Sequence, residues 1–276
     1  MDRRIIINAD DFGLCDGVNK AVAQAHTNGV LTSATILANM PAAEDAVKIA
    51  KQLPDLGVGV HLNLSTGKAL STDKSVKLLL NKTGELGLPL LKLLLLSSIS
   101  HEFRTAIRTE LASQIQWVID NGLTPTHLDS HKHIHSFPTI FHIVCELAGR
   151  FKIKAVRFTG EPKEISRPPW PLPTESGRKN AAKIRIMAKI NRIQNADFLK
   201  TDAILGIAHT GKINVNFFRA VTLYNTAATA EVMTHPCLTD TNVPGHQNAE
   251  LEALCSERTR QFFTDAKINL LHFGQP

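Results

Sequence analysis

Four histidines and one aspartate lie within ten residues in the segment THLDSHKHIH, residues 126–135. Neutral imidazole is the commonest protein ligand for divalent metals, and it exchanges a proton near neutral pH. The segment follows the turn signal Asn121-Gly122 and precedes an apolar, helix-like run from Phe137 to Leu147. A histidine tag would be terminal and unbroken, whereas this cluster is internal and contains apolar residues. We therefore interpret it as a metal-binding or proton-transfer site where a strand ends and a helix begins.

Two adjacent carboxylates, Asp10 and Asp11, form a second polar group in the string NADDFG, residues 8–13. Successive side chains of a strand point in opposite directions, so one carboxylate can ligate a metal while the other handles a proton. Gly13 permits a close backbone turn directly after them. The alternative interpretation is that one of the two aspartates caps a helix that begins near Gly17.

His61 lies among apolar residues in the string GVHLNL, residues 59–64. A lone histidine in such a strand is usually a core residue. Together with Asp11 and His131 it would complete an Asp/His/His set. Mixed sites of this kind, with open positions on Zn²⁺, Mn²⁺, Co²⁺ or Mg²⁺, can polarise a carbonyl and activate water.

Short runs rich in Ile, Val and Leu alternate with helical patterns along the chain, which predicts βαβ crossovers and a parallel sheet. Strands are expected at residues 4–9, 33–38, 57–62, 126–129, 154–158, 203–207, 231–234 and 268–272, and helices near 17–28, 42–52, 102–121, 137–150, 179–199, 215–225 and 248–264. This rhythm favours an α/β fold, a distorted TIM-like (β/α) barrel of seven to eight units, in a single domain over residues 1–276. An open doubly wound sheet is the alternative. Insertions are expected near 65–100 and 161–178.

Catalytic residues of such a barrel lie at the carboxyl ends of its strands. Ionisable side chains fall at or near predicted strand ends repeatedly: Asp10, Asp11, His61, Asp129, His131, Arg157, His209, His235 and His272. Convergence of this many carboxylate and imidazole groups on one rim is hard to explain as solvation. It predicts an active site there.

The composition limits the function classes. Hydrophobic residues make up 43% of the 276 residues and charged residues 20%, which is typical of a globular protein. The net charge of +6 is too modest to predict nucleic-acid binding. Four scattered cysteines without a Cys-x-x-Cys pair, and an N-terminus without a signal-peptide pattern, favour a cytoplasmic protein with reduced thiols.

The strings NADDFG, GVHLNL and THLDSHKHIH, together with THP at residues 234–236, resemble the YdjC-like carbohydrate deacetylases. That family includes chitooligosaccharide deacetylases and hopanoid-biosynthesis-associated proteins. The resemblance implies a barrel-like hydrolase that uses a divalent metal to remove acetyl from an N-acetylated sugar, with Mg²⁺ as the first expectation and Zn²⁺ as the alternative. It implies Asp11, His61 and His131 as metal ligands. It further implies Asp10 as the general base and His235 as a catalytic residue near the acyl group.

Four other residues are candidates for substrate binding: His127, Asp129, His133 and Arg157. Asp129 could instead orient a ligand histidine, and His133 could cap the next helix. Segments 156–162 and 205–211 resemble the hopanoid-associated branch. The basic helical segment 179–200 suits a lipid-linked sugar, so both a chitooligosaccharide-like and a lipid-linked N-acetylglucosamine substrate are retained.

Two rival functions remain: another metal-dependent hydrolase such as a phosphoesterase, and a non-catalytic sugar-binding protein on the same fold. The second is disfavoured because sugar binding alone would not need the full Asp/Asp/His/His set. A weak membrane-surface contact and a homodimer are left open.

Overall fold

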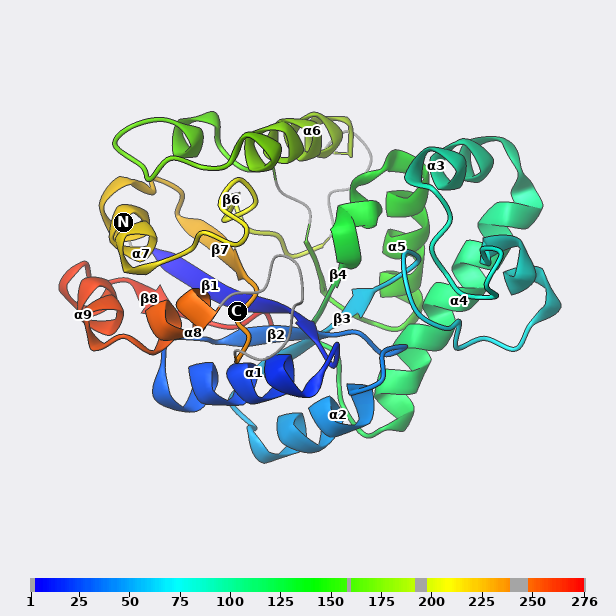
Figure 1. Cartoon of the computed structure of the whole chain (residues 1–276), viewed down its shortest axis with the longest axis horizontal. Helices are drawn as coiled ribbons and strands as arrows, with labels where there is room; N and C mark the ends of the chain where they lie inside the picture. The colour runs from blue at the N-terminus through cyan, green and yellow to red at the C-terminus, as the bar shows by residue number, and fades with distance from the viewer. Residues whose placement is uncertain (1–2, 158–159, 192–197, 239–247, 276) are drawn as a thin grey trace.

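A curled parallel sheet forms the centre of the protein (Figure 1). The computed structural model describes residues 3–157, 160–191, 198–238 and 248–275. Within these residues seven strands follow the order β5-β4-β3-β2-β1-β7-β6, and β8 pairs with β1 beside that path. The strands are β1 (Arg4–Phe12), β2 (Ser33–Ile36), β3 (Gly57–Leu62), β4 (His127–Ser130), β5 (Ala155–Val156), β6 (Ala203–Leu205), β7 (Thr229–Thr234) and β8 (Asn269–Leu270). All of their ladders are parallel, as the alternation of apolar runs and helical patterns predicts.

Helices surround the sheet on its outer side (Figure 1). They are α1 (Asp16–Asn28), α2 (Ala43–Gln52), α3 (Leu90–Ile99), α4 (His101–Asp120), α5 (Pro138–Arg150), α6 (Glu175–Asn191), α7 (Val215–Tyr224), α8 (Asn248–Cys255) and α9 (Glu257–Asp265), with the short 3₁₀ helices η1 (Lys74–Leu79), η2 (His131–Ser136) and η3 (Lys163–Ser166). In β1, Ile5, Ile7 and Ala9 are fully buried in the main apolar core, while Asn8 and Asp10 belong to the buried polar groups. This two-residue alternation gives the second half of β1 an apolar face and a polar face.

The sheet is an incomplete barrel. β5 and β6 are its edge strands, and the described residues contain no ladder between them. A single parallel bridge joins Ala155 of β5 to Leu199, four residues before β6 begins. The two-residue length of β5 leaves few backbone groups for a longer pairing. The predicted parallel α/β sheet is therefore confirmed, and complete closure of a TIM-like barrel is not seen.

The two predicted insertions contribute helices and loops. Residues 65–100 contain η1 and α3 and add no strand to the sheet, and residues 161–178 contain η3 and the start of α6. The predicted helix over 179–199 begins earlier, at Glu175, and its stretch 192–197 lies outside the described residues. None of the described helices has the length and apolar character needed to cross a membrane.

The buried carboxylate of Glu161 joins the proline-rich segment to the turn after β6. Its Oε1 accepts a hydrogen bond from the N–H of Gly206 at 2.7 Å, and its Oε2 accepts one from Ala208 at 2.8 Å. Gly206 has a φ of 109°, and a side chain there would meet the carbonyl oxygen of Met233 at 2.5 Å. Burial raises the pKa of Glu161 to about 7, although the backbone N–H groups oppose the shift.

This pKa makes the stability of the fold depend on pH. The pKa of Glu161 in the folded protein lies above the ordinary value of 4.5, so the folded chain binds the proton more tightly than the unfolded chain. Its contribution to the free energy of unfolding is therefore complete below about pH 4.5 and is lost as the pH rises through about 7. Glu161→Gln cannot titrate at this position. We therefore expect the free energy of unfolding of wild type to exceed that of Glu161→Gln by a larger amount at about pH 5 than at about pH 8. The change in this difference should be on the order of 2 kcal/mol.

Urea denaturation at the two pH values measures this difference. The control is Glu164→Gln, at an exposed carboxylate three residues away. Its difference from wild type in free energy of unfolding should be the same at both pH values. An equally constant difference for Glu161→Gln would contradict the prediction.

Candidate functional site

A cavity of about 480 Å³ opens at the carboxyl ends of the strands. We call it the Asp/His cavity. Its lining comes from several strand ends and from α6, and comprises Asp10, Asp11, Leu14, Met40, His61, Ser65, Thr66, Ser130, His131, Lys132, His133, Asn180, Thr210, Met233 and His235. The structure thus brings together six of the residues that the sequence predicts for the site: both aspartates of β1 and four of the histidines.

A bulge at the end of β1 places both aspartates in this cavity. The register between β1 and β2 shifts between Ala9 and Phe12, and Asp11 has a left-handed φ of 66°. A bulge re-aims side chains that regular alternation would send to opposite faces. The expectation that the two carboxylates point in opposite directions is therefore wrong, because it assumed an unbroken strand.

Neither aspartate caps the following helix, since the N-cap of α1 is Cys15. Gly13 turns the chain as expected, with a φ of 95°. Its N–H donates to Asn19 Oδ1 at 2.8 Å. The alternative interpretation of the aspartates as helix caps is thereby removed.

His61 is held by carboxylates at both ring nitrogens. Its Nδ1 lies 2.7 Å from Asp129 Oδ1, and its Nε2 lies 3.2 Å from Asp11 Oδ1. Thr35 Oγ1 donates to Asp129 Oδ2 at 3.1 Å and so fixes the carboxylate that orients the ring. Burial disfavours a charged imidazole, but Asp129, Asp10 and Asp11 outweigh this and raise the pKa of His61 well above its usual value. Because Nδ1 faces Asp129, the nitrogen turned toward Asp11 is Nε2.

His131 reaches the same cavity from the end of β4. Its Nδ1 lies 2.7 Å from Ser65 Oγ, and its ring centroid lies 6.0 Å from that of His61. Burial lowers the pKa of His131 to about 4 against the attraction of Asp11. The ring is therefore neutral at neutral pH, which leaves one nitrogen with a lone pair that can bind a metal.

Asp11, His61 and His131 fit a divalent cation by the chemistry of their donor atoms. They offer one carboxylate and two imidazoles at one cavity, and the other nitrogen of each ring is oriented by Asp129 or Ser65. Metal-binding histidines usually have their other ring nitrogen hydrogen-bonded to a neighbouring oxygen in this way. Mixed nitrogen and oxygen donors suit several divalent ions, so the set does not identify the metal.

A second set of donors lies close together. Asp10, His61 and Asp129 are buried, and each has a ligand atom within 4.8 Å of the others. Both carboxylates of this set are also ion-paired with Arg157. A cation among them would have to replace these ion pairs, so we favour Asp11, His61 and His131 as the metal-binding set.

Arg157 lies beneath the Asp/His cavity, 3% exposed, and does not line it. Its Nη1 and Nη2 donate to the two oxygens of Asp10 at 2.7 and 2.6 Å, and Nη1 also lies 2.9 Å from Asp129 Oδ2. Nε and Nη2 donate to Glu231 Oε1 at 2.9 and 2.7 Å. We call these four residues the Arg157 network. The structure thus places Arg157 with carboxylates, away from where a substrate would lie.

The Arg157 network sets the charge of Asp10. Burial alone would raise the pKa of Asp10, but Arg157 outweighs it and holds that pKa well below its usual range. Burial raises the pKa of Glu231 to about 7, with Arg157 opposing. Asp10 is therefore ionised at neutral pH and can accept a proton. Glu231 was missed by the sequence analysis, although an acidic residue inside a predicted apolar strand is a signal for a buried ion pair.

His235 and His133 line the cavity, whereas His127 does not. The backbone N–H of His235 donates to Glu250 Oε2 at 2.7 Å, and Glu250 Oε1 accepts from Gly211 at 3.0 Å. Burial lowers the pKa of His133 to about 3. His127 is fully buried, and its ring stacks on Phe273 with centroids 4.0 Å apart.

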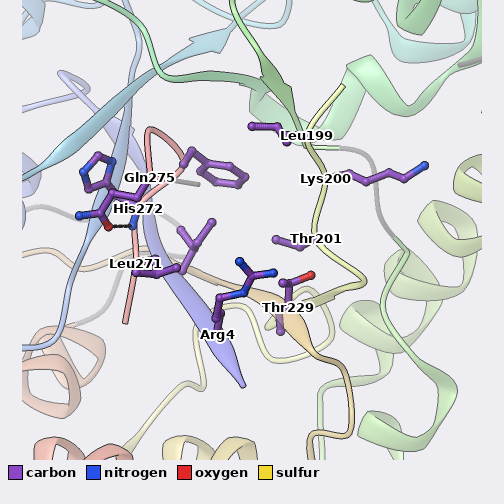
Figure 2. Close-up of a pocket in the computed structure, with 11 residues that line it drawn as sticks. Arg4, Leu199, Lys200, Thr201, Thr229, Leu271, His272 and Gln275 are labelled. Atoms are coloured by element: carbon purple, nitrogen blue, oxygen red, sulfur yellow. Dashed lines mark hydrogen bonds between the residues drawn. The ribbon is translucent and has the colours of Figure 1, made fainter. Parts of the chain in front are cut away.

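The other strand-end histidines are used elsewhere. His209 Nε2 lies 2.7 Å from the carbonyl oxygen of Pro171, and its ring packs on Phe217. His272 lines a separate cavity of about 130 Å³ together with Arg4 and Thr229, the first residues of β1 and β7 (Figure 2). This cavity lies at the opposite end of β1 from Asp10 and Asp11. The predicted convergence on one rim therefore does not include His209 or His272.

An incomplete parallel barrel with carboxylates and imidazoles gathered at its strand ends defines an α/β protein with a candidate metal centre. Residues 4–265 match the family model described as YdjC-like protein, and the chain belongs to this family. It is 32% identical to a carbohydrate deacetylase of Brevibacillus brevis over 279 aligned positions, which cover 99% of both chains.

A second relative and a solved structure are also similar to this chain. A carbohydrate deacetylase of Geobacillus stearothermophilus is 43% identical over 156 residues, which are 55% of this chain and 59% of that relative. A solved structure from Enterococcus faecalis V583, provisionally named for cellobiose-phosphate cleavage, superposes with a TM-score of 0.75 at 22% identity and covers 99% of this chain and 98% of its own. At that identity the superposition supports the fold alone.

The two donor sets can be separated by metal analysis. We expect wild type to bind one divalent ion per chain, and Asp11→Ala and His131→Ala to lose most of it because each removes a direct ligand. His61→Ala should also lose metal, but His61 belongs to both sets. Elemental analysis after dialysis measures occupancy, with His142→Ala, an exposed histidine on α5, as control. Full occupancy in Asp11→Ala and His131→Ala, with loss in Asp129→Ala, would show that the second set binds the ion.

Proposed function

We propose that this protein is a metal-dependent deacetylase that hydrolyses the acetamide of an N-acetylated sugar. One observation supports this most directly: Asp10, Asp11, His61, His131 and His235 line a single cavity although they come from distant parts of the chain. The names of the relatives, carbohydrate deacetylases with one aligned over 99% of both chains, support the same reaction class.

A divalent ion bound by Asp11, His61 and His131 would supply a Lewis acid for the acetyl carbonyl and would lower the pKa of a bound water. The choice of Mg²⁺ or Zn²⁺ stays a prediction from the resemblance. Asp129 would keep His61 Nε2 turned toward the cavity, and Ser65 would do the same for His131. These contacts prepare the ligands before any ion binds, which reduces the cost of ordering them.

Asp10 is the residue best placed to accept the proton of the attacking water. Arg157 keeps it ionised and holds it in one orientation through two hydrogen bonds. Oδ1 also accepts from Asn8 Nδ2 at 2.9 Å, so the oxygen that still has a lone pair available for the water's proton is Oδ2. The low pKa makes Asp10 a weak base, so it contributes mainly through its position and takes up the proton as the attacking water becomes acidic in the transition state.

His235 lies on the β7 side of the same cavity and would protonate the leaving amine. Its backbone is fixed by the buried carboxylate of Glu250, which also holds Gly211 in the loop after β6. An imidazole can donate a proton near neutral pH. The amide nitrogen needs this proton because an unprotonated amine anion is a very poor leaving group. His133, on the wall next to His131, would contact the sugar.

Asp10→Asn tests the base. We expect the variant to keep its metal but to lose about 10²–10⁴-fold in turnover, because an amide cannot accept the proton. The measurement is acetate release from a panel of N-acetylated sugars, with metal content determined on the same preparations. Asp16→Asn, an exposed aspartate at the start of α1, is the control. Near-normal turnover by Asp10→Asn would exclude this role. Phosphate release from aryl phosphates in the same panel, without acetate release, would favour a phosphoesterase instead.

Helix α6 has features that suit a lipid-linked sugar, the second candidate form of the substrate. Asn180 of this helix lines the Asp/His cavity, and Ile186 and Ile190 on its outer side are 56% and 40% exposed. Arg178, Lys179 and Lys189 are exposed on the same helix. An apolar and basic face of this kind next to a cavity suits contact with an anionic membrane surface.

Vesicle sedimentation at two salt concentrations tests this contact. Each cation near an anionic leaflet contributes about 1 kcal/mol, so Lys189→Glu should lower binding to anionic vesicles by about tenfold or more at low salt. Lys51→Glu, on the distant helix α2, should not. Fast acetate release from diacetylchitobiose with no sedimentation of wild type would refute the lipid-linked substrate. A homodimer and the absence of nucleic-acid binding stay predictions.

A further inference from the structure

We propose that a surface cavity between the proline-rich segment 161–174 and helix α7 binds a small organic anion that carries a flat ring. The cavity, which we call the Trp170 cavity, measures about 410 Å³. That volume falls within the range of about 300–1,000 Å³ usual for small-molecule sites. Within the described residues, its lining and that of the Asp/His cavity have no residue in common. The inference is therefore independent of the proposed deacetylase function.

One face of α7 forms the first wall. It contributes Asn216, Arg219, Ala220, Leu223 and Tyr224, each three or four positions from another of the five. Residues at this spacing lie on the same face of a helix. All of them except Ala220 are exposed, whereas the opposite side of α7 is buried in the core. The wall is thus open to a ligand.

The proline-rich segment passes over α7 and forms the second wall (Figure 1). The indole of Trp170 packs on Phe217 and Tyr224, with ring centroids 6.0 and 6.2 Å apart. Pro169 and Pro171, on either side of Trp170, restrict the backbone because each pyrrolidine ring fixes φ. A wall held in this way loses little conformational entropy when a ligand binds.

The Trp170 cavity carries a positive charge without a partner. The side chains of Arg219 and Tyr224 make no hydrogen bond or ion pair within the part of the chain that the structure describes. Neither α7 nor the stretch 165–174 contains an aspartate or a glutamate. The planar guanidinium presents paired N–H donors that match the two oxygens of a carboxylate or a phosphate. The charge of Arg219 and the shape of its guanidinium therefore favour an anion.

The rest of the lining favours a flat ring over a polyhydroxylated sugar. Leu223 and Tyr224 are 57% and 42% exposed, so each offers apolar surface to a ligand. An aromatic ring can stack on Tyr224 or pack against its edge. Sugar hydroxyls need several acceptors, but the described lining side chains include no carboxylate and a single amide, that of Asn216. A ring with one anionic group satisfies both the apolar and the charged part of the cavity.

His209 connects the Trp170 cavity to the Asp/His cavity. Its Nε2 lies 2.7 Å from the carbonyl oxygen of Pro171, and burial lowers its pKa, so the neutral ring donates this hydrogen bond. The next residue, Thr210, lines the Asp/His cavity. A ligand in the Trp170 cavity thus contacts a segment that is hydrogen-bonded to the wall of the candidate active site.

Tryptophan fluorescence tests this site without any measurement of turnover. The chain has two tryptophans, so Trp117→Phe leaves Trp170 as the single reporter. AMP and benzoate each carry a flat ring and an anionic group, whereas adenosine lacks the anion and inorganic phosphate lacks the ring. We expect a saturable change in emission with AMP, with benzoate or with both, and none with adenosine or phosphate at the same concentrations.

The two ring anions distinguish the source of the ligand. A response to AMP alone supports a nucleotide, and a response to benzoate alone supports an aromatic acid. No response to either at millimolar concentrations would overturn the inference. Binding of inorganic phosphate as tight as that of AMP would also overturn it, because the ring would then contribute nothing.

Variants of the helical wall locate the binding. We expect Arg219→Gln to weaken the binding of the responding probe by about tenfold or more, since hydrogen bonds between ionised groups are the stronger ones. Tyr224→Ala should weaken it as well, through loss of the stacking surface. The control is Arg258→Gln, at an exposed arginine of α9 outside the cavity, which should leave the affinity unchanged.

Both test positions are exposed, so the variants should fold, and circular dichroism checks this. If one variant does not fold, the other decides. Unchanged affinity in the folded variants would overturn the assignment of the site. Wild type that releases no acetate from any sugar contradicts only the proposed deacetylase function, because the titration measures binding in the absence of that reaction.

Discussion

One buried guanidinium holds the functional end of this protein together. Arg157 follows the short strand β5 and meets Asp10 of β1, Asp129 of β4 and Glu231 of β7, all at 3% exposure or less. Moving such charges out of water costs several kcal/mol for each ion, and the cost is offset only when the partners stay in place. Removing any one partner leaves a buried charge without compensation. The network therefore ties β1, β4 and β7 to one another through a single side chain.

The same network determines what the cavity above it can do. Asp129 is shared between Arg157 and His61, and Asp10 is shared between Arg157 and the cavity. The orientation of a predicted metal ligand and that of the predicted base thus depend on a single side chain that touches neither the cavity nor a substrate. A neutral replacement of Arg157 would affect both at once. A cation in this position also offsets the repulsion among the three carboxylates that it contacts.

Much of the fold and part of the site could be predicted from local patterns. Apolar runs located the strands because period and burial are local properties, and the residues that converge on the cavity follow those strands. Other features depend on tertiary contacts that no local pattern records. The bulge at Asp11 turns two aspartates to one side. Glu231 stands out as an acid in an apolar strand, but its partner Arg157 lies far from it in the sequence. Ser65 and Glu250 belong to segments whose sequence says nothing of the histidines they hold. The incomplete barrel results from the two-residue β5, where a longer strand was expected.

The segment 65–100 illustrates why an irregular insertion can belong to the site. It adds no strand, yet its first residue contacts His131, and its first two residues line the Asp/His cavity. Glu110 and Gln114 fix this loop from the side of α4, and Asn39 and Asn63 fix it from the side of the sheet. A displacement of this loop would therefore move Ser65, whose hydroxyl contacts Nδ1 of His131. The orientation of a predicted metal ligand thus depends on a loop outside the sheet, so substitutions in this segment should preserve the site only where they leave Asn63 and Ser65 in place.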